Sequence, residues 1–532
     1  MNAKENIGSI AVHIMKSMLS LAWDITQQLT TLTKPIYGMW CVLRNAIVQF
    51  FNVRSLSTSR YRNTNNYDGP CIEEVKLLQK HHVAPCHKPI YKQPILIHRG
   101  HMQYLYDANG KEYLDCYGGI VTVSVGHCHP YVVEAVERQL RKIWHTTVIY
   151  MNPSLNIYSQ KLTSKLPGDL KVAYLVNSGS EANDLALLLA RLYTGNYEML
   201  SIQNCYHGMS LGTMGLTSSS NWRFPIPSVN HGIHHVKNPN PYNGRWGGAA
   251  CRTSPVQTDR ECECFDGKCK ATSNYIEELE DVFKYSIPKE KCAGMIAESI
   301  QGVGGTVQFT KGYLKEAATL VRLNNGLFIS DEVQTGFGRT GDHFWGFESQ
   351  DFVPDIVTMA KGIGNGFPLA AVVTTPKIAQ CLTQSSHFNT FGGNPLACAA
   401  GLAVLEVIEK EGLQQNSKDV GTYFLKSLNQ LRDIHEVVGD VRGQIIKLLS
   451  PFQRSQGLMI GVEFVESKET RVPLSKNQFE QIWNCTKDYG VLFGCGGYYG
   501  NVMRIKPPMC ITKKNVDFAI EAMHCAIKSI KQ

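Results

Sequence analysis

Three short apolar runs in the middle of the chain are followed by polar residues that could act together on one small molecule. Asp331 follows the run LFIS, and Lys361 lies between the run IVTMA and the glycine-rich segment GIGNG. A lysine in such a place is partly desolvated, which lowers its pKa and exposes a nucleophilic amine. A third run, KVAYLV, leads into the small-residue segment NSGSEAND, which starts at Asn177. A turn of this kind at the start of a helix presents unpaired N–H groups that can bind a phosphate.

Each of these features alone has a simpler interpretation. A small-residue turn is usually a helix cap, and a lone lysine often lies at the surface. A carboxylate at a strand end, such as Asp331 or Glu298, often belongs to a structural salt bridge. The three features together favour a ligand that carries a phosphate, a protonated ring nitrogen and an aldehyde. Pyridoxal 5'-phosphate has all three groups.

Strand-forming runs alternate with helical patterns around these residues. One of the helices is expected at Asn183–Tyr193, and the strands are expected at 172–176, 199–202, 295–297, 327–329 and 356–359. Strands separated by helices predict an α/β fold with a mostly parallel sheet that is covered on both faces. In such sheets the ligand binds beyond the carboxyl ends of the strands, where Asp331 and Lys361 are expected.

Several motifs resemble the class III aminotransferases of fold type I. They are NSGSEAND, YHG at 206–208, DEVQTGFGRTG at 331–341, TMAKGIGNGFPLAAV at 358–372 and TFGGNP at 390–395. The resemblance runs from about Pro89 to the C-terminus. A cysteine-rich stretch and the tail MRIKPPMCIT resemble one mitochondrial branch of this family in particular. The resemblance implies a large domain around the parallel sheet and a smaller α+β domain built from both chain ends.

The resemblance also implies a division of the chain. The expected parts are a leader at 1–68, an N-terminal segment of the small domain at 69–125, the large cofactor-binding domain at 126–395 and the C-terminal small domain at 396–532. Within the last part, the run IIKLLSPFQRSQ is extra relative to the family. We expect residues 444–456 to form an inserted loop away from the cofactor, unless they are a wrongly joined piece of the gene.

By the same resemblance, five residues surround the cofactor ring. Lys361 would form a Schiff base with the cofactor and move the substrate proton in a ping-pong scheme. Asp331 would keep the ring nitrogen protonated, and Gln334 would bind the ring hydroxyl. Val333 and Tyr206 would pack on the two faces of the ring. These assignments make Lys361 and Asp331 the expected catalytic pair.

The phosphate would be held from two subunits. Gly179 and Ser180 would offer backbone N–H groups, and Thr390 would reach the phosphate of the neighbouring subunit. The resemblance therefore implies a homo-oligomer, a dimer or a tetramer, with shared active sites. His207 is either a residue that supports the site or a packed core histidine, and the sequence leaves both interpretations open.

Arg504, in NVMRIKPP, matches the family arginine that binds a substrate carboxylate, and a guanidinium suits a carboxylate. Branches that act on ω-amino groups often carry a glutamate that masks this arginine, but here the corresponding residue is Val303. This favours small substrates such as alanine, glyoxylate, pyruvate or 3-aminoisobutyrate. A phospho-lyase acting on amino-alcohol phosphates and an inactive cofactor-binding protein remain as alternatives.

The N-terminal residues have the composition of a mitochondrial transit peptide. No acidic residue occurs from Ile25 to Tyr67, and residues 1–62 carry +5 of the total net charge of +8. Import into the mitochondrial matrix is therefore expected. The apolar stretch Pro35–Phe51 contains Arg44 and is too short for a comfortable membrane span. The charge left for the rest of the chain is small and forms no basic stripe, so no nucleic-acid partner is expected.

Four of the 17 cysteines lie close together in the sequence: Cys251, Cys262, Cys264 and Cys269. Four thiolates can hold a zinc ion. The spacing lacks paired C-x2-C motifs, so the sequence favours reduced thiols in a surface loop, and no metal is expected.

Overall fold

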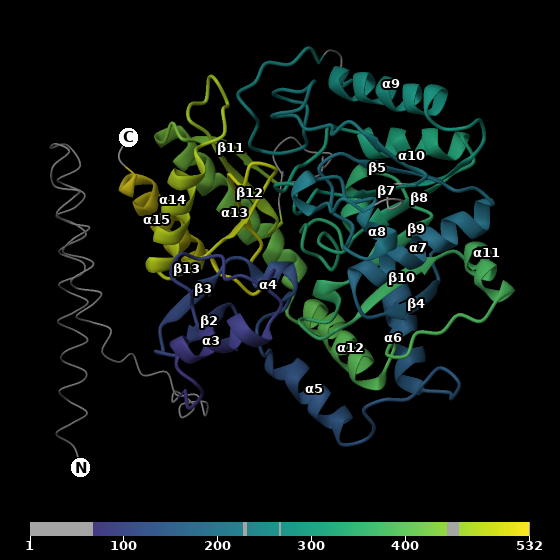
Figure 1. Cartoon of the computed structure of the whole chain (residues 1–532), viewed down its shortest axis with the longest axis horizontal. Coiled ribbons are helices and arrows are strands. Elements are labelled where there is room, and N and C mark those ends of the chain that lie inside the picture. Colours follow the sequence, from purple (N-terminus) through teal and green to yellow (C-terminus); the bar gives the residue numbers. More distant parts are fainter. Residues whose placement is uncertain (1–66, 227–230, 265–267, 444–456, 531–532) are drawn as a thin grey trace. The chain divides into compact units, whose positions relative to one another are not determined.

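The computed structural model describes residues 67–226, 231–264, 268–443 and 457–530 (Figure 1). The expected leader, apart from its last two residues, and the expected inserted loop at 444–456 lie outside these residues. Within the described residues no helix is long and apolar enough to cross a membrane.

A seven-stranded sheet forms the centre of the large domain. Its order is β4 (Val172–Val176), β10 (Ala370–Thr374), β9 (Ile356–Met359), β8 (Leu327–Asp331), β7 (Cys292–Glu298), β5 (Glu198–Ile202) and β6 (Ile233–Val236). Five of these strands were expected from the sequence. The sheet is parallel from β9 to β6, while β10 runs antiparallel to both of its neighbours. The predicted fold class, α/β with a mostly parallel sheet, is confirmed.

Helices cover both faces of this sheet, and for this reason its central strands are buried on both sides. Ile329 packs in one hydrophobic cluster with α7 (Gly179–Thr194). Its neighbour Phe328 points to the other face and packs in a second cluster with α9 (Lys270–Tyr285) and α10 (Tyr313–Leu323). The alternation along β8 therefore places α7 on one face and α9 and α10 on the other.

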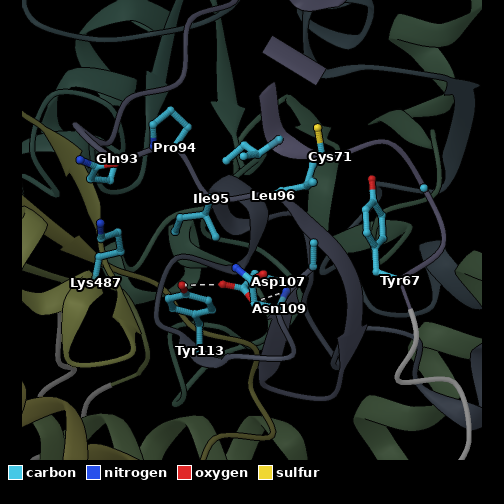
Figure 2. Close-up of a pocket in the computed structure, with 13 residues that line it drawn as sticks. Tyr67, Cys71, Gln93, Pro94, Ile95, Leu96, Asp107, Asn109, Tyr113 and Lys487 are labelled. Carbon is cyan, nitrogen blue, oxygen red and sulfur yellow. Dashed lines mark hydrogen bonds between the residues drawn. The ribbon is translucent and has the colours of Figure 1, made fainter. Parts of the chain in front are cut away.

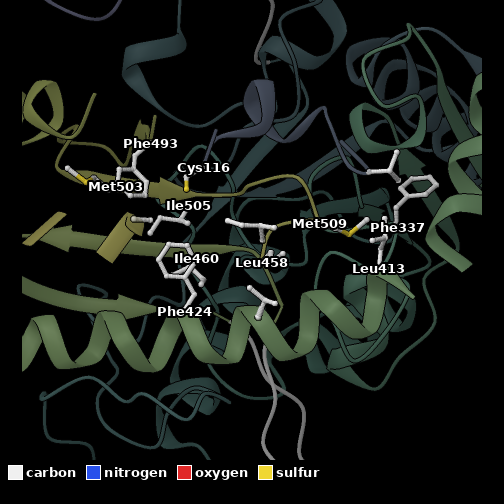
Figure 3. Close-up of a cluster of buried hydrophobic side chains, with 14 of the residues drawn as sticks. Cys116, Phe337, Leu413, Phe424, Leu458, Ile460, Phe493, Met503, Ile505 and Met509 are labelled. Carbon is white, nitrogen blue, oxygen red and sulfur yellow. The ribbon is translucent and has the colours of Figure 1, made fainter. Parts of the chain in front are cut away.

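The C-terminal region forms a second, antiparallel sheet packed on helices. Its strand order is β11 (Val438–Arg442), β12 (Ile460–Phe464), β15 (Val502–Ile505) and β14 (Gly494–Gly496). The helices here are α13 (Leu413–Ile434), α14 (Lys476–Asp488) and α15 (Lys513–Ser529). Figure 3 shows how Ile460 and Ile505 of the sheet face Phe424 of α13. This core positions β15, the strand that carries Arg504.

The N-terminal segment joins this C-terminal region through a third sheet. It consists of β1 (Ile97–His101), β2 (Tyr104–Asp107), β3 (Glu112–Asp115) and β13 (Val491–Leu492). In β13, Val491 pairs with Leu114 of β3 in parallel. The two ends of the chain therefore share one sheet, as the resemblance implies.

Further helices complete the described residues. The long ones are α3 (Ile72–His82), α5 (Pro130–Leu140), α6 (Pro153–Thr163) and α12 (Pro395–Lys410), and α12 packs against α5 and α6. The short helices are α4 (Gly118–Val121), α8 (Leu211–Met214) and α11 (Pro376–Ala379), and single 3-10 turns occur at Ser220–Trp222, Gly346–Gln350, Lys361–Ile363 and Gln380–Gln384.

Candidate active site

The carboxyl ends of three neighbouring strands bring polar side chains to one edge of the large sheet. Glu298 at the end of β7 pairs in register with Asp331 at the end of β8. Asp331 in turn pairs with Thr358 of β9, and Lys361 follows three residues later. The parallel order of the strands thus collects two carboxylates and one amine at the edge where ligands bind in such sheets.

Asp331 is buried and is held by side chains from α7 and from the loop after β5. Asn183 of α7 donates a hydrogen bond from Nδ2 to Asp331 Oδ2 at 2.9 Å, and Nδ1 of His207 lies 2.8 Å from the same oxygen. The other oxygen, Oδ1, accepts the backbone N–H of Val333 at 3.1 Å. The carboxylate is therefore fixed in orientation, which an acidic partner for a ring nitrogen requires.

His207 contacts Asp331, so the structure decides between the two interpretations that the sequence left open. Burial alone would lower the pKa of His207, but the thiol of Cys205 and the carboxylate of Asp331 raise it well above its usual value. The ring is fully enclosed, and its Nε2 has no hydrogen-bond partner among the described residues. A protonated His207 would keep Asp331 ionised, so we class it as a positioning residue.

Lys361 lies on a strained turn directly after β9. Its φ angle is +53°, in the left-handed region that side chains other than glycine rarely adopt. Two hydrogen bonds fix the turn, since Ser124 Oγ donates to the carbonyl of Gly362 at 2.7 Å and Asn365 Oδ1 accepts from the N–H of Val125 at 3.0 Å. Burial first, and Arg504 second, lower the pKa of Lys361 to about 8, although Asp331 and Glu298 act in the opposite direction. A lowered pKa of this kind is what the predicted nucleophilic amine requires.

The segment expected to bind a phosphate begins α7. Gly179 and Ser180 are its first two residues, so their N–H groups have no partner within the helix. Ser178 caps the helix by accepting from the N–H of Glu181. A Cβ on Gly179 would lie 3.3 Å from the side chain of Val333, which places this turn beside the residues that follow Asp331. The turn and the strand ends therefore belong to one site.

Gln334 connects this site to the C-terminal sheet. Its Oε1 accepts hydrogen bonds from Arg504 Nη2 at 3.2 Å and from Lys506 Nζ at 3.0 Å. Arg504 also donates from Nη1 to the hydroxyl of Tyr117 at 3.1 Å. The expected ring residue and the expected substrate arginine are therefore in direct contact.

Lys506 and Tyr117 are site residues that the sequence analysis did not name. Lys506 is fully buried, and burial, followed by the charge of Arg504, lowers its pKa well below the usual value. Burial also raises the pKa of Tyr117. Strand alternation could have identified Lys506, because a residue two positions after Arg504 shares its face of the strand, and Lys506 directly follows β15.

Tyr206 and Val333 lie at the same strand ends. The backbone N–H of Tyr206 donates to Glu298 Oε1 at 3.2 Å, and its ring lies edge-on to Trp222 with centroids 5.3 Å apart. Burial, followed by the charges of Asp331 and Glu298, raises the pKa of Tyr206. Its packing on a face of the cofactor ring stays a prediction.

Thr390 is the one expected site residue that this chain does not bring to the others. It is exposed, and its neighbour Asn389 donates from Nδ2 to Glu181 Oε2 at 3.1 Å near the start of α7. The ring of Phe391 lies edge-on to that of His145, with centroids 5.6 Å apart. Thr390 thus lies at the surface, next to a residue that contacts the start of α7.

These residues fit pyridoxal 5'-phosphate. The start of α7 offers unpaired N–H groups for the phosphate, and Asp331 has an oxygen with free acceptor capacity for a protonated ring nitrogen. Lys361 supplies a partly neutral amine for the aldehyde. In addition, Nε of Arg504 is buried without a partner among the described residues, as expected for a group that binds a ligand.

A separate pocket lies in the N-terminal segment (Figure 2). Tyr67, Cys71, Asp107, Tyr113 and Lys487 are among the residues that line it. Within it Asp107 accepts hydrogen bonds from the Tyr113 hydroxyl and from backbone N–H groups of its own turn, so its polar groups are already paired. None of the expected site residues lines this pocket.

Comparisons with known proteins agree with this geometry. The family model described as Aminotransferase class-III matches residues 87–527. The Homo sapiens protein named alanine–glyoxylate aminotransferase 2, mitochondrial, is 50% identical over 451 residues, which cover 85% of each chain. A solved (S)-enantioselective omega-transaminase from Thermomicrobium roseum is 28% identical with a TM-score of 0.75, covering 87% of this chain and 99% of its own. A phospholyase from Arthrobacter in complex with phosphoethanolamine is also 28% identical, with a TM-score of 0.74 and coverage of 86% and 100%.

Proposed function

Because the chain belongs to the class III aminotransferases, we propose that it transfers the amino group of alanine or a small β-amino acid to glyoxylate or pyruvate. It is an aminotransferase that depends on pyridoxal 5'-phosphate, and its substrates are amino acids and oxo acids. The human relative that is 50% identical is named for alanine and glyoxylate. Two half-reactions alternate on one site in a ping-pong scheme.

The observation that carries this substrate class is the environment of Arg504. The guanidinium is buried and donates to three neutral oxygens, those of Gln334, Tyr117 and the backbone carbonyl of Cys495. None of the acidic side chains in the described part of the chain forms an ion pair with it. A buried charge without a counter-ion is costly, so the site is suited to a carboxylate brought by the substrate.

The residue at position 303 also leaves Arg504 without a masking carboxylate. The α-carbon side of Gly496 packs against Arg504, and a Cβ there would lie 2.9 Å from the carbonyl oxygen of Val303. Residue 303 therefore borders the arginine, and a valine there cannot form an ion pair with it. Arg504 is thus available to a carboxylate in both half-reactions.

Different residues of the chain keep the ring protonated, transfer the substrate proton, orient the substrate and bind the phosphate. When bound, the cofactor supplies an aldehyde that accepts amino groups and a protonated ring that draws electrons from the substrate carbon. Asp331, held by Asn183 and His207, would keep the ring nitrogen protonated. Lys361 Nζ, with its pKa lowered to about 8, takes up and returns a proton near neutral pH. Arg504 orients the substrate through its carboxylate, and Gly179 and Ser180 bind the phosphate.

A phospho-lyase is the alternative, because one of the similar solved structures is a phospholyase. Incubating the purified enzyme with alanine and glyoxylate, and separately with phosphoethanolamine, distinguishes the two activities. We expect pyruvate from the first mixture and no inorganic phosphate from the second. Phosphate release without pyruvate would replace this proposal with elimination, and neither product would indicate an inactive cofactor-binding protein.

We also place the enzyme in mitochondria, as a homo-oligomer with shared sites. The related human protein is named as mitochondrial, and residues 1–62 are basic. A row of apolar side chains, including Trp144, Ile149 and Met151, is exposed in the single chain, and Met151 is 94% exposed. Exposed apolar surface of this kind is typical of a subunit interface. His145 links this segment to Phe391, next to Thr390, so an interface here would bring Thr390 to a second subunit.

A further inference from the structure

The structure gathers three cysteines from separate parts of one long loop. The Sγ atoms of Cys251 and Cys264 are 3.3 Å apart, and those of Cys264 and Cys269 are 3.8 Å apart. All three sulfurs lie within 4.8 Å of one another. Cys251 is fully buried, whereas Cys264 and Cys269 are partly buried.

These distances match the coordination of one metal ion. Four sulfurs at about 2.3 Å from a tetrahedral zinc are about 3.8 Å from each other. A disulfide would require about 2.0 Å, so no pair among the three is bonded. Thiolates on a multi-iron cluster bind different iron atoms, which spreads them further apart. Soft thiolates grouped around one point are typical of zinc.

We propose that Cys251, Cys264 and Cys269, with Cys262 as the fourth ligand, bind a structural zinc ion. Cys262 lies two residues before Cys264 and packs on the same hydrophobic cluster as Cys264 and Cys269, which is why we assign it as the fourth ligand. The sequence favours reduced thiols because the spacing has no C-x2-C pair. The fold nevertheless brings the thiols together, because Cys269 lies at the start of α9, and its sulfur is within 4.8 Å of that of the buried Cys251.

A zinc ion would stabilise a long loop that has little regular secondary structure. The described residues between β6 and α9 form turns and bends, and loops of this length without helix or strand need another source of order. Next to Cys251 in the sequence, the side chain of Arg252 donates two hydrogen bonds, of 2.8 and 2.9 Å, to the carboxylate of Asp440 in β11. A zinc ion at Cys251 would hold this arginine in place and so connect the large domain to the C-terminal sheet.

The test is the metal content of the purified holoenzyme, measured by mass spectrometry after dialysis against metal-free buffer. We expect one zinc per chain, released when an organomercurial blocks the thiols and detected with a zinc-binding dye. X-ray absorption should show four sulfur neighbours at about 2.3 Å. Three sulfurs with one lighter ligand would overturn the assignment of Cys262, and iron would overturn zinc.

Variants connect the ion to these thiols. Cys264→Ser should lose the zinc and unfold at a temperature several degrees lower, because binding free energy contributes to folding. It should keep the visible absorption of the cofactor, since Lys361 and Asp331 lie on other strands. Cys381→Ser, which changes a partly buried cysteine of another segment, should keep both zinc and stability. A wild-type protein without metal, or one whose mass shows a disulfide among these cysteines, would refute the proposal.

Discussion

The lowered pKa of Lys361 comes first from burial, and the charges of Arg504 and Asp331 shift it in opposite directions. With a pKa of about 8, roughly 10% of the amine is neutral at pH 7, against about 0.03% at the ordinary value of 10.5. Burial is the largest cause of the lowering, and Arg504 adds to it. The chain thus prepares a nucleophile at neutral pH without a separate base to deprotonate it.

Removing the two charges should move the Lys361 pKa in opposite directions. Asp331→Asn removes a negative charge that raises this pKa, so we expect a value below about 8. Arg504→Met removes a positive charge that lowers it, so we expect a higher value. Labelling amines of the cofactor-free protein at several pH values, with mass spectrometry of the Lys361 peptide, gives both values. The exposed Lys142 should have one unchanged profile throughout, and shifts of the same sign in both variants would contradict this electrostatic account.

Single residues show where sequence reasoning reaches its limit. The motifs around Lys361, Asp331, Gln334 and Arg504 carry residue types that fit one cofactor, and the structure brings these four together. Lys506 lies within NVMRIKPP, but the resemblance gave it no role, and Tyr117 belongs to none of the motifs. Their place in the site follows from the contacts that Lys506 makes with Gln334 and that Tyr117 makes with Arg504. The role of His207 depended on one 2.8 Å contact with Asp331, which no sequence pattern specifies.

At the scale of elements, hydrophobic runs predict strands but not their direction. The five expected strands are present, but β10 (Ala370–Thr374) lies antiparallel between β4 and β9. A fully buried strand has the same apolar run in either direction, so its orientation is set by the connections rather than by composition. The cysteine-rich loop is a similar case. The sequence has no C-x2-C pair that would indicate a metal site, but the fold brings three of the sulfurs within 4.8 Å of one another.

A buried ionic network connects that loop to the C-terminal sheet. Asp440 of β11 binds Arg252 and Arg442, and Arg442 also binds Glu463 of β12 at 2.6 Å and the carbonyl oxygen of Gly305 at 2.7 Å. Burial alone would raise the pKa of Asp440, but the two arginines lower it below its usual value. The ionised carboxylate is therefore part of the folded state.

Removing this carboxylate should strongly destabilise the protein. Asp440→Asn leaves two buried arginines short of a negative charge, which costs about 3–5 kcal/mol. Because the folded pKa lies below the unfolded value of about 3.9, the wild-type stabilisation is present above that pH and is lost as the pH falls further. Denaturant unfolding at pH 7 and at pH 3 measures both effects.

The matched control for this network is a surface ion pair. Asp351 pairs with Lys315 and has a side chain that is 90% exposed, so Asp351→Asn should leave the unfolding midpoint unchanged. If Asp440→Asn were equally neutral at pH 7, the network would not contribute to stability as described.

At the scale of the whole molecule, the proposed interface makes each active site depend on two chains. We expect hybrid dimers to reveal this dependence. Lys361→Ala and Thr390→Glu should each be nearly inactive, the second because a carboxylate at the rim repels the phosphate. Mixed and refolded together, they should regain about a quarter of the wild-type activity, because half of the dimers contain one intact site.

The opposite arrangement gives a different result. If Thr390 served its own chain, the mixture would have only the average activity of the two variants. Light scattering on the same samples reports the mass of the assembly, and a monomer at assay concentrations would contradict the shared site. A variant such as Met151→Asp, at the exposed apolar segment, should weaken the assembly without changing the fold.

The most direct test of the account is to trap the cofactor on the protein. Treating the yellow holoenzyme with borohydride fixes the cofactor to the amine that holds it, and mass spectrometry of the digested protein identifies the peptide. We predict one pyridoxyl phosphate group per chain, attached to Lys361, and none in Lys361→Ala. A group on another lysine, or a protein that takes up no cofactor, would contradict the assignment of this site.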